Sequence, residues 1–377
     1  MVARCVRGTD FDYGRLRVNL QRAPLRGFSA DELLLRCVRS GDLIVEKSGG
    51  GDQQPVGRVV LFEGDEPAVP TNFAGRLRPG PGIDSRYMCY VMASLYFDGR
   101  TVAAVKRTTG IQNLDLDALM DNLVRIPPEE GQEKVAAFLD AASAHIDSLA
   151  DLKRRLIALL KRRLSGATRS AALTQGWPIA PLRRLAQVID CKHRTPQYVV
   201  DGLPVVSPGD VQPGRLDLAR CHRFVGEDDF ADLTEGPRRP MRGDIVYSRN
   251  ASIGIAALVD TDDRFSMGQD VCLIRTADHD SRWLTLMLNT LGVEQLQEMK
   301  IGSTFDRVNI RQLLDLQIPA PPREVQEAEA ARLDELGRQA AKVIAKLTQQ
   351  LALLQERRQA LITAAVTGQL DIPGVAA

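Results

Sequence analysis

Basic and polar residues that could contact a nucleic acid recur in loops along this 377-residue chain. One loop, "VKRTTG" (105–110), has a counterpart in "MKIGST" (299–304); another pair of loops follows two strands that open with Gly-Asp; a further loop is "CKHRTPQY" (191–198). Lysine and arginine can neutralise phosphates, while arginine, asparagine and glutamine can hydrogen-bond base edges in the DNA major groove. The candidates are Lys47, Ser48, Lys106, Arg107, Thr108, Lys192, His193, Arg194, Gln197, Arg249, Asn250, Ser252, Lys300, Ser303 and Thr304.

For any one of these residues, an ordinary solvated loop is the alternative explanation, because surface loops are commonly polar. Acid pairs such as Asp228 and Asp229 lie in turn-like segments and are expected to be solvated loop charges of that kind. The recurrence of the basic loops at equivalent places in two halves of the chain favours nucleic-acid binding for the set as a whole.

The sequence offers no motif for catalysis of its own. It contains no G-x-x-x-x-G-K-[ST] phosphate loop and no G-x-G-x-x-G after a strand, and it lacks G-x-S-x-G, H-E-x-x-H and the N-P-P-[YF] tetrad of amino-methyltransferases. The four histidines have no metal-ligand spacing, and the six cysteines form no C-x-x-C pair. We therefore expect no catalytic residue, no metal site and reduced, buried thiols.

Length and composition set the broad class. A chain of 377 residues has room for two or more domains, and 44% hydrophobic with 26% charged residues is typical of a soluble globular protein. No run of about 18 apolar residues predicts a membrane span. The N-terminus lacks the apolar core of a signal peptide, which predicts a cytoplasmic protein. The net charge of +1 does not indicate nucleic-acid binding, so the placement of the basic residues is what matters.

A gapless internal repeat organises the chain. Residues 106–140 align with residues 300–334, which places two consecutive prolines on two others and Gln132 on Gln326. A weaker correspondence joins the segments that open with "GDLIVEKS" and "GDIVYSRN". In each copy, proline in the first turn followed by glutamate is a helix-start signal. The repeat predicts a strand-rich domain followed by a long helix, and then the same again.

Both long helices carry apolar residues at alternating spacings of three and four. Lys153 and Gln350 each interrupt one of these seams, and such a polar position can fix register or partner. Two matched seams favour the helices packing on each other over each helix lying on its own domain. The seam residues are Leu139, Ile146, Leu149, Leu156 and Leu160 in the first helix and Leu333, Leu336, Val343, Leu347 and Leu354 in the second.

These features together resemble the specificity subunit of type I restriction–modification systems. The resemblance covers nearly the whole chain. Its most specific marks are "RRQALITAAVTG" (357–368) and the two Pro-Pro-x-x-x-Gln helix starts, and "HRTP" (193–196) is similar to a segment that opens many recognition domains of the family. The resemblance implies an α+β fold with two target recognition domains, at residues 1–125 and 176–318. Long helices at residues 126–175 and 319–377 would pair as an antiparallel coiled coil.

The function implied by the resemblance is non-catalytic reading of a bipartite site in double-stranded DNA. Methyltransferase subunits would dock on the helices and domains, bringing S-adenosylmethionine for adenine methylation. A restriction subunit that translocates DNA would join them for cleavage, with ATP and Mg on the partners and no cofactor on this chain. Six basic residues of the first helix could track DNA or meet acidic partner surfaces, and we favour partners because the second helix is less basic: Lys153, Arg154, Arg155, Lys161, Arg162 and Arg163.

One departure from the family pattern lies at the start. The second copy opens with "WPIAPLRRLAQVIDCKHRTPQYVVDG" (177–202), whereas the match of the first copy begins at about Val2. The first recognition domain is therefore expected to lack roughly its first 25 residues, through a late start codon, a shortened gene or a segment supplied in another way. Loss of an opening strand would expose a sheet edge and an apolar surface.

Two other classes of function stay open at the level of sequence. A helical scaffold whose globular ends bind proteins predicts no salt-dependent DNA binding, whereas a DNA reader predicts an affinity that falls steeply with salt. A fused enzyme with its own methylase or nuclease would require the motifs that are missing.

Overall fold

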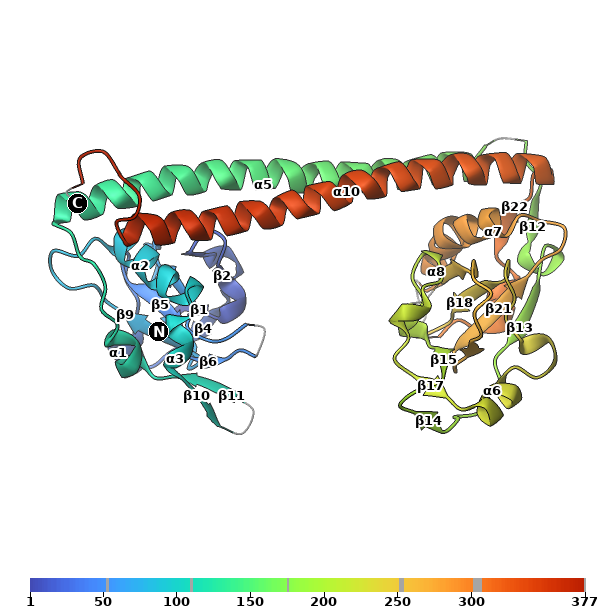
Figure 1. Cartoon of the computed structure of the whole chain (residues 1–377), viewed down its shortest axis with the longest axis horizontal. Coiled ribbons are helices and arrows are strands. Elements are labelled where there is room, and N and C mark those ends of the chain that lie inside the picture. The colour runs from blue at the N-terminus through green and yellow to red at the C-terminus, as the bar shows by residue number, and fades with distance from the viewer. Residues whose placement is uncertain (52–53, 109–110, 175, 251–253, 301–306, 376–377) are drawn as a thin grey trace. The chain divides into compact units, whose positions relative to one another are not determined.

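The computed structural model describes residues 1–51, 54–108, 111–174, 176–250, 254–300 and 307–375 (Figure 1). Its contacts divide the chain into two compact units, one of Met1–Leu156 with Lys346–Ala377 and one of Ile157–Ala345. Each unit holds one globular part and part of each long helix. The boundaries thus fall inside the helices rather than at the ends of the four expected segments, because each helix end joins the core of the globular part beside it.

The first unit contains three small sheets, in the strand orders β2-β3-β7-β5-β9, β4-β1-β8 and β10-β11-β6. Its strands are β1 Val2–Val6, β2 Phe11–Asp12, β3 Arg17–Val18, β4 Leu25–Gly27, β5 Leu43–Glu46, β6 Ser48–Gly49, β7 Val59–Leu61, β8 Ala68–Pro70, β9 Ala74–Leu77, β10 Val105–Thr108 and β11 Ile111–Leu114. Its short helices are α1 Ala30–Arg36, α2 Ser85–Phe97, α3 Arg100–Ala103 and α4 Leu116–Met120, with 3-10 turns at Gly8–Asp10 and Leu20–Arg22.

The second unit repeats this plan, with its strands divided differently among the sheets. Its sheets have the orders β13-β21-β18-β19-β16, β14-β17-β15-β20 and β12-β22. The strands are β12 Ile179–Pro181, β13 Gln187–Asp190, β14 Tyr198–Val199, β15 Leu203–Val206, β16 Gly214–Arg215, β17 Phe224–Val225, β18 Ile245–Ser248, β19 Ile255–Leu258, β20 Ser266–Met267, β21 Val271–Arg275 and β22 Gln317–Pro319. The helices are α6 Glu227–Leu233, α7 Ser281–Met287, α8 Val293–Lys300 and α9 Ile310–Leu314, with 3-10 turns at Leu182–Arg184, Pro208–Asp210, Leu218–Arg220 and Gly236–Arg238 and a π-helical turn at Leu288–Gly292.

The strand after each Gly-Asp dipeptide, β5 or β18, is apolar up to its last residue because both of its faces are covered. In β5, Leu43 and Val45 join the core beneath α2, while Ile44 joins a separate core on the opposite face. In β18, Tyr247 and Val246 divide between two cores in the same way. A strand buried on both faces loses the alternation of apolar and polar residues that marks a half-exposed strand.

The aspartate of each Gly-Asp dipeptide is a structural residue. Asp42 is 2% exposed, accepts a hydrogen bond from the Arg39 amide at 2.8 Å and pairs with both ends of the Arg78 guanidinium at 2.6 Å. Asp244 makes the same contacts with the Met241 amide and Arg275. Each dipeptide therefore closes a turn and joins two strands of its sheet.

Replacing Asp42 by alanine should lower the free energy of unfolding of the first unit by about 1–3 kcal/mol near neutral pH, since a buried cap and its cation partner are lost. Burial opposes ionisation of Asp42, but the Arg78 and Arg39 hydrogen bonds outweigh it and lower the pKa below the ordinary 3.8. The stabilisation is thus present above that value and is lost as the pH falls through the lower, folded-state pKa. Urea unfolding at neutral and acidic pH tests this, with Asp65→Ala, an exposed loop acid, as the control.

A buried glutamine fixes the start of each long helix, α5 Glu129–Ala172 and α10 Arg323–Val366. Gln132, 1% exposed, accepts a hydrogen bond from the Asp84 amide at 3.0 Å and donates to the carbonyl oxygens of Gly82 and Pro127. Gln326 accepts from the Asp280 amide at 2.9 Å and donates to the carbonyl of Pro321. This explains the duplicated Pro-Pro-x-x-x-Gln motif: the glutamine ties the helix start to the beginning of α2 or α7.

The two long helices pair antiparallel, as expected, within each unit. In the first unit Asp147 contacts Arg358, while six residues further along α5 Lys153 donates to the Oε1 atom of Gln350 at 2.7 Å, so residue numbers rise along one helix as they fall along the other (Figure 1). The two polar interruptions of the predicted seams therefore meet each other. Arg358 is 5% exposed and also donates to the carbonyl of Gly14, which ties α10 to the first globular part.

Most of the predicted seam is buried or half-buried, with the lowest exposure at Leu139, Ile146, Leu333 and Leu347. Leu156 and Val343 are exceptions, at 44% and 42% exposed, so their assignment to a closed seam is wrong. Within the second unit a cavity of about 450 Å³ opens between α5 and α10 and is lined by Leu160, Leu336 and Val343 among others. The gap between the helices explains why Val343 remains accessible.

Across the described ranges, no helix is long and apolar enough to cross a membrane.

Candidate nucleic-acid interface

The candidate loops of the second unit meet at one end of its five-stranded sheet. β13 and β18 both pair antiparallel with β21, so their last residues lie beside the first two residues of β21. This arrangement brings Asp190, Arg249 and Asp270 together, although they are far apart in the sequence. The end of the sheet thus positions the loops that follow β13 and β18.

Arg249 is not the exposed DNA ligand that the sequence suggested. It is 5% exposed, its Nε donates to the carbonyl of Val308 at 3.0 Å, and its Nη1 pairs with Asp190. The backbone of Arg249 also accepts from the Val308 amide at 2.8 Å. The assignment is corrected for a physical reason: a buried guanidinium bonded to two other segments holds those segments together and is not presented to a ligand.

The loop after β13 lies on acidic residues of α6. Lys192 pairs with Asp232 and with Glu235, the latter at 3.2 Å, while Arg194 pairs with Asp229 and, at 2.8 Å, with Asp232. The hydrogen bonds that these cations donate raise the pKa of Lys192 and lower the pKa of Asp232. The loop is therefore held in one shape, and its positive charge is largely balanced within the unit.

Other side chains of this loop remain accessible. Gln197 is exposed, with its backbone amide donating to Asp229 at 3.0 Å. His193 is exposed beside Asp190, with Nε2 3.1 Å from the carboxylate. Arg223 stacks over the ring of Tyr198 at 5.3 Å.

The expectation that Asp229 is a solvated loop charge is wrong, since it belongs to α6 and its carboxylate binds Arg194 and the Gln197 amide. No sequence motif marked Asp229, Asp232 or Arg223, because their role depends on contacts across the fold.

The second pair of predicted loops is built alike in both units. In the first unit β11 pairs with β6, which sets Asn113 opposite Ser48, with the Ser48 hydroxyl 2.5 Å from the Asn113 Oδ1 atom. In the second unit Asn250 forms an isolated bridge with Arg307. In both units, therefore, the segment after the Gly-Asp strand pairs with an equivalent position of the gapless repeat, Asn113 or Arg307.

The basic residues of the first unit lie on and beside a hairpin of β10 and β11. Lys106 is exposed and pairs with Asp115 at 2.6 Å, and Arg107 is also exposed. Lys47 is half-buried at the end of β5, where its carbonyl accepts from the Leu114 amide. The structure thus brings Lys47, Ser48 and the hairpin together. Of the remaining candidates, Ser252, Ser303 and Thr304 lie outside the described residues, as do the side chains of Thr108 and Lys300.

Asp190, Cys191 and His193 offer ligand atoms within 4.8 Å of one another. The sequence predicted no metal site, and the surroundings favour an ion pair at this place. Asp190 already binds the Arg249 guanidinium, and burial raises the pKa of the Cys191 thiol, which opposes the thiolate that a metal requires.

The basic residues on α5 differ from those of the loops. Lys153 and Arg154 are engaged by Gln350 and Asp151. The other four are exposed and, across the described ranges, have neither an acidic nor a hydrogen-bonding partner: Arg155, Lys161, Arg162 and Arg163. Uncompensated charge of this kind is suited to long-range attraction of an acidic surface.

Replacing these four residues by glutamine should leave folding intact, because their side chains contact little. We expect roughly tenfold weaker association with an acidic partner protein, with most of the loss removed at high salt, where screening weakens exposed charges. Titration of the chain with a methyltransferase subunit, the partner that the sequence resemblance leads us to expect, at two salt concentrations measures the effect. Glutamine at Lys342, Lys346 and Arg357, which are exposed on α10, is the matched control, and equal losses in both variants would rule out a specific role for α5.

Comparison with known proteins agrees with this architecture. Residues 196–353 match the family model for the type I restriction modification DNA specificity domain. No curated protein matches the chain. A chain solved in a study of complex assembly and conformational transition of the type I R-M system is 17% identical, with a TM-score of 0.74 and coverage of 98% of this chain and 92% of that one. The HsdS subunit from Thermoanaerobacter tengcongensis is 16% identical, with a TM-score of 0.53 and coverage of 98% and 91%. At these identities the likeness concerns the fold.

Proposed function

Because the chain belongs to the type I restriction–modification specificity subunits, we propose that it reads a bipartite site in double-stranded DNA for partner subunits that methylate adenine and cleave. Each globular part would read one half of the site, and the paired helices would set the spacing between the halves. The observation that carries this proposal is the repeated construction of the two units: in each, the residue at the equivalent place of the gapless repeat, Asn113 or Arg307, pairs with the segment after the Gly-Asp strand.

The chemistry of the loops favours base reading over phosphate binding in the second unit. The cations Lys192 and Arg194 are already neutralised by α6 carboxylates, so phosphate contacts there would require exchange of partners. Gln197 can bind an adenine edge with its exposed side-chain amide. In the first unit, Lys106 pairs with Asp115 but stays exposed, as does Arg107 beside it on the hairpin, and exposed cations are suited to phosphates.

Partner subunits would supply the chemistry that this chain lacks. We propose that a methyltransferase subunit carrying S-adenosylmethionine docks on α5, where the exposed Leu152, Leu156 and Leu159 fall on one helical face through their spacing of four and three. A restriction subunit using ATP and Mg would join for cleavage, and the assembly would act in the cytoplasm. One solved relative comes from a study of type I R-M complex assembly, which supports an assembly of this kind.

Mapping methylated adenines in the host genome with and without the gene tests the proposal. The expected result is loss of one methylated motif that has two defined parts separated by unread positions. A scaffold without DNA specificity predicts an unchanged set of motifs, and that outcome in cells that make the intact complex would contradict the proposal.

A further inference from the structure

In the second unit, one continuous stretch of chain covers the edges of three other strands. Residues 179–199 supply β12, which pairs with β22, β13, which pairs with β21, and β14, which pairs with β17. The same stretch places Leu182, which is fully buried, into the core. It then turns directly into β15.

The first unit has counterparts of all three covered strands, and among its described residues each has an open edge. β9 corresponds to β21, since Asp42–Arg78 repeats Asp244–Arg275, and it ends its sheet with β5 as its single partner. β4 corresponds to β17, since it flanks β1 as β17 flanks β15, and it too ends its sheet. Residues 123–125, which the gapless repeat aligns with β22, belong to no strand.

Exposure follows the same pattern. All residues of β9 are partly exposed, whereas four of the five residues of β21 are buried. Leu25 on β4 is 59% exposed, and Leu123 is 93% exposed. On α1, beside these edges, Leu34 and Leu35 are 81% and 70% exposed. Apolar side chains at this density, next to unpaired strand edges, indicate a surface that is built to be covered.

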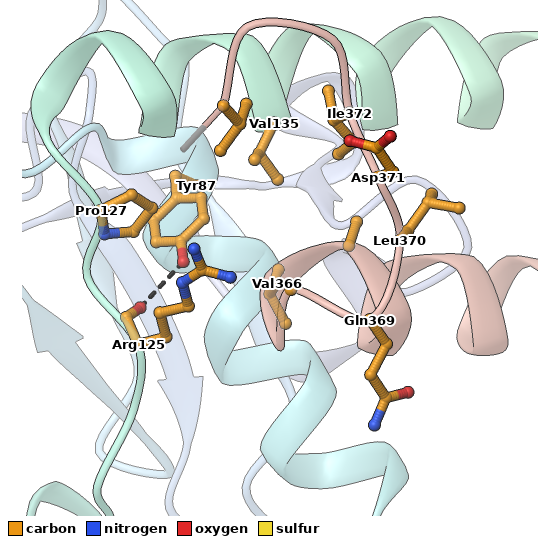
Figure 2. A pocket seen from close by; sticks show the side chains of 12 residues that line it. Tyr87, Arg125, Pro127, Val135, Val366, Gln369, Leu370, Asp371 and Ile372 are labelled. Carbon is orange, nitrogen blue, oxygen red and sulfur yellow. Dashed lines mark hydrogen bonds between the residues drawn. The ribbon is translucent and has the colours of Figure 1, made fainter. Parts of the chain in front are cut away.

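A cavity marks the place where the stretch would begin. In the second unit Trp177 packs edge-on against Trp283 at 5.4 Å, and the Trp283 indole donates to the carbonyl of Pro319. In the first unit Tyr87 takes the place of Trp283, and its hydroxyl donates to the carbonyl of Arg125 at 2.8 Å (Figure 2). Beside Tyr87 lies a cavity of about 400 Å³, walled in part by Leu370 and Ile372 of the segment after α10.

We propose that the first unit binds one further polypeptide segment, running directly into the N-terminal end of β1, which covers all three edges. The source follows from the topology, since the covering stretch of the second unit leads through one turn into β15, the counterpart of β1. The segment would form strands against residues 123–125, β9 and β4. The part of the segment that lies over α1 would be apolar. Leu35 has the same position relative to the N-cap of α1 as Asp232 has relative to the N-cap of α6, and Asp232 binds Lys192 of the covering stretch in the second unit.

Hydrogen exchange on the full chain tests this, because it reports each edge separately and does not depend on DNA binding. A segment copied from residues 178–202 is joined ahead of Val2, with leucine in place of the residue that corresponds to Lys192. We expect amides of β4, β9 and residues 123–125 to exchange at least about tenfold more slowly than in the unextended chain. A synthetic peptide of the same sequence, added in trans to the unextended chain, should protect the same amides more weakly.

The control carries proline at the two positions that correspond to Val188 and Ile189, which blocks strand pairing against β9. It should lose protection at β9 specifically. Leu35→Asp should have little effect on the unextended chain, where the side chain is solvated, and should reduce protection in the extended chain. Equal exchange at all three edges in the extended chain and its proline control would overturn the proposal.

Discussion

Replacing Arg249 by alanine should lower the free energy of unfolding of the second unit by about 3 kcal/mol, since a buried guanidinium is removed from its carboxylate and carbonyl partners. The destabilisation should be greatest at the end of the sheet that carries the candidate loops, because Arg249 joins the segment after β18 to Asp190 and Val308. We therefore expect weaker DNA binding as a consequence of a disordered interface. Thermal unfolding together with hydrogen exchange of residues 187–199 measures both effects.

Arg307→Ala provides the matched control. Arg307 pairs with Asp270 at 2.7 Å in the same region, but its side chain is 46% exposed. An exposed pair contributes little, so the loss should stay below about 1 kcal/mol. If Arg249→Ala were as mild as Arg307→Ala while changing the base preference of the chain, Arg249 would be a DNA ligand after all, and its assignment to the framework would be wrong.

Replacing Gln132 or Gln326 by leucine should cost about 3 kcal/mol each, because a buried amide is removed and its backbone partners are left unpaired. In the first unit the unpaired groups are the Asp84 amide and the carbonyls of Gly82 and Pro127. The first turn of α5 or α10 would then lose its hydrogen bonds to the start of α2 or α7 and could separate from it. We expect premature unfolding of the affected unit, detected as faster hydrogen exchange in the first turns of α5 or α10.

The paired variants distinguish a local from a general effect. Gln132→Leu should destabilise only the first unit and Gln326→Leu only the second, since each glutamine bonds within its own unit. Gln339→Leu, on the exposed surface of α10, should have little effect. Loss of both units in either single variant would indicate that the helix starts are coupled through the helix pair.

The internal repeat predicted more of the structure than any motif did. It predicted where both long helices start, and together with the family resemblance it predicted their antiparallel pairing. The two polar positions that interrupt the predicted seams, Lys153 and Gln350, are hydrogen-bonded to each other. These features depend on spacing along the chain, which a sequence displays directly. The cavity between the helices of the second unit, and with it the exposure of Val343, depends on how closely the helices approach, which spacing does not determine.

The candidate interface was harder to predict, because the contacts that decide it join distant segments. Arg249 and Asn250 are adjacent polar residues after a strand, yet Arg249 is buried by partners 59 residues away in both directions. Asp229 was expected to be a loop charge, but it lies on α6 with Asp232, where the two carboxylates pair with Lys192 and Arg194. Residue type and spacing selected loops that gather at one end of the sheet, and burial then separated framework residues from those still available to a ligand.

Selection from a library of random DNA duplexes by the purified chain tests the central claim most directly. Reading of DNA by two repeated units predicts an enriched motif with two defined parts at a fixed separation. Gln197→Ala should relax the preference in one part and leave the other unchanged, since we propose that each unit reads its own half of the site. Enrichment of no sequence at any salt concentration at which the chain binds DNA, or an equal change in both parts, would contradict the account.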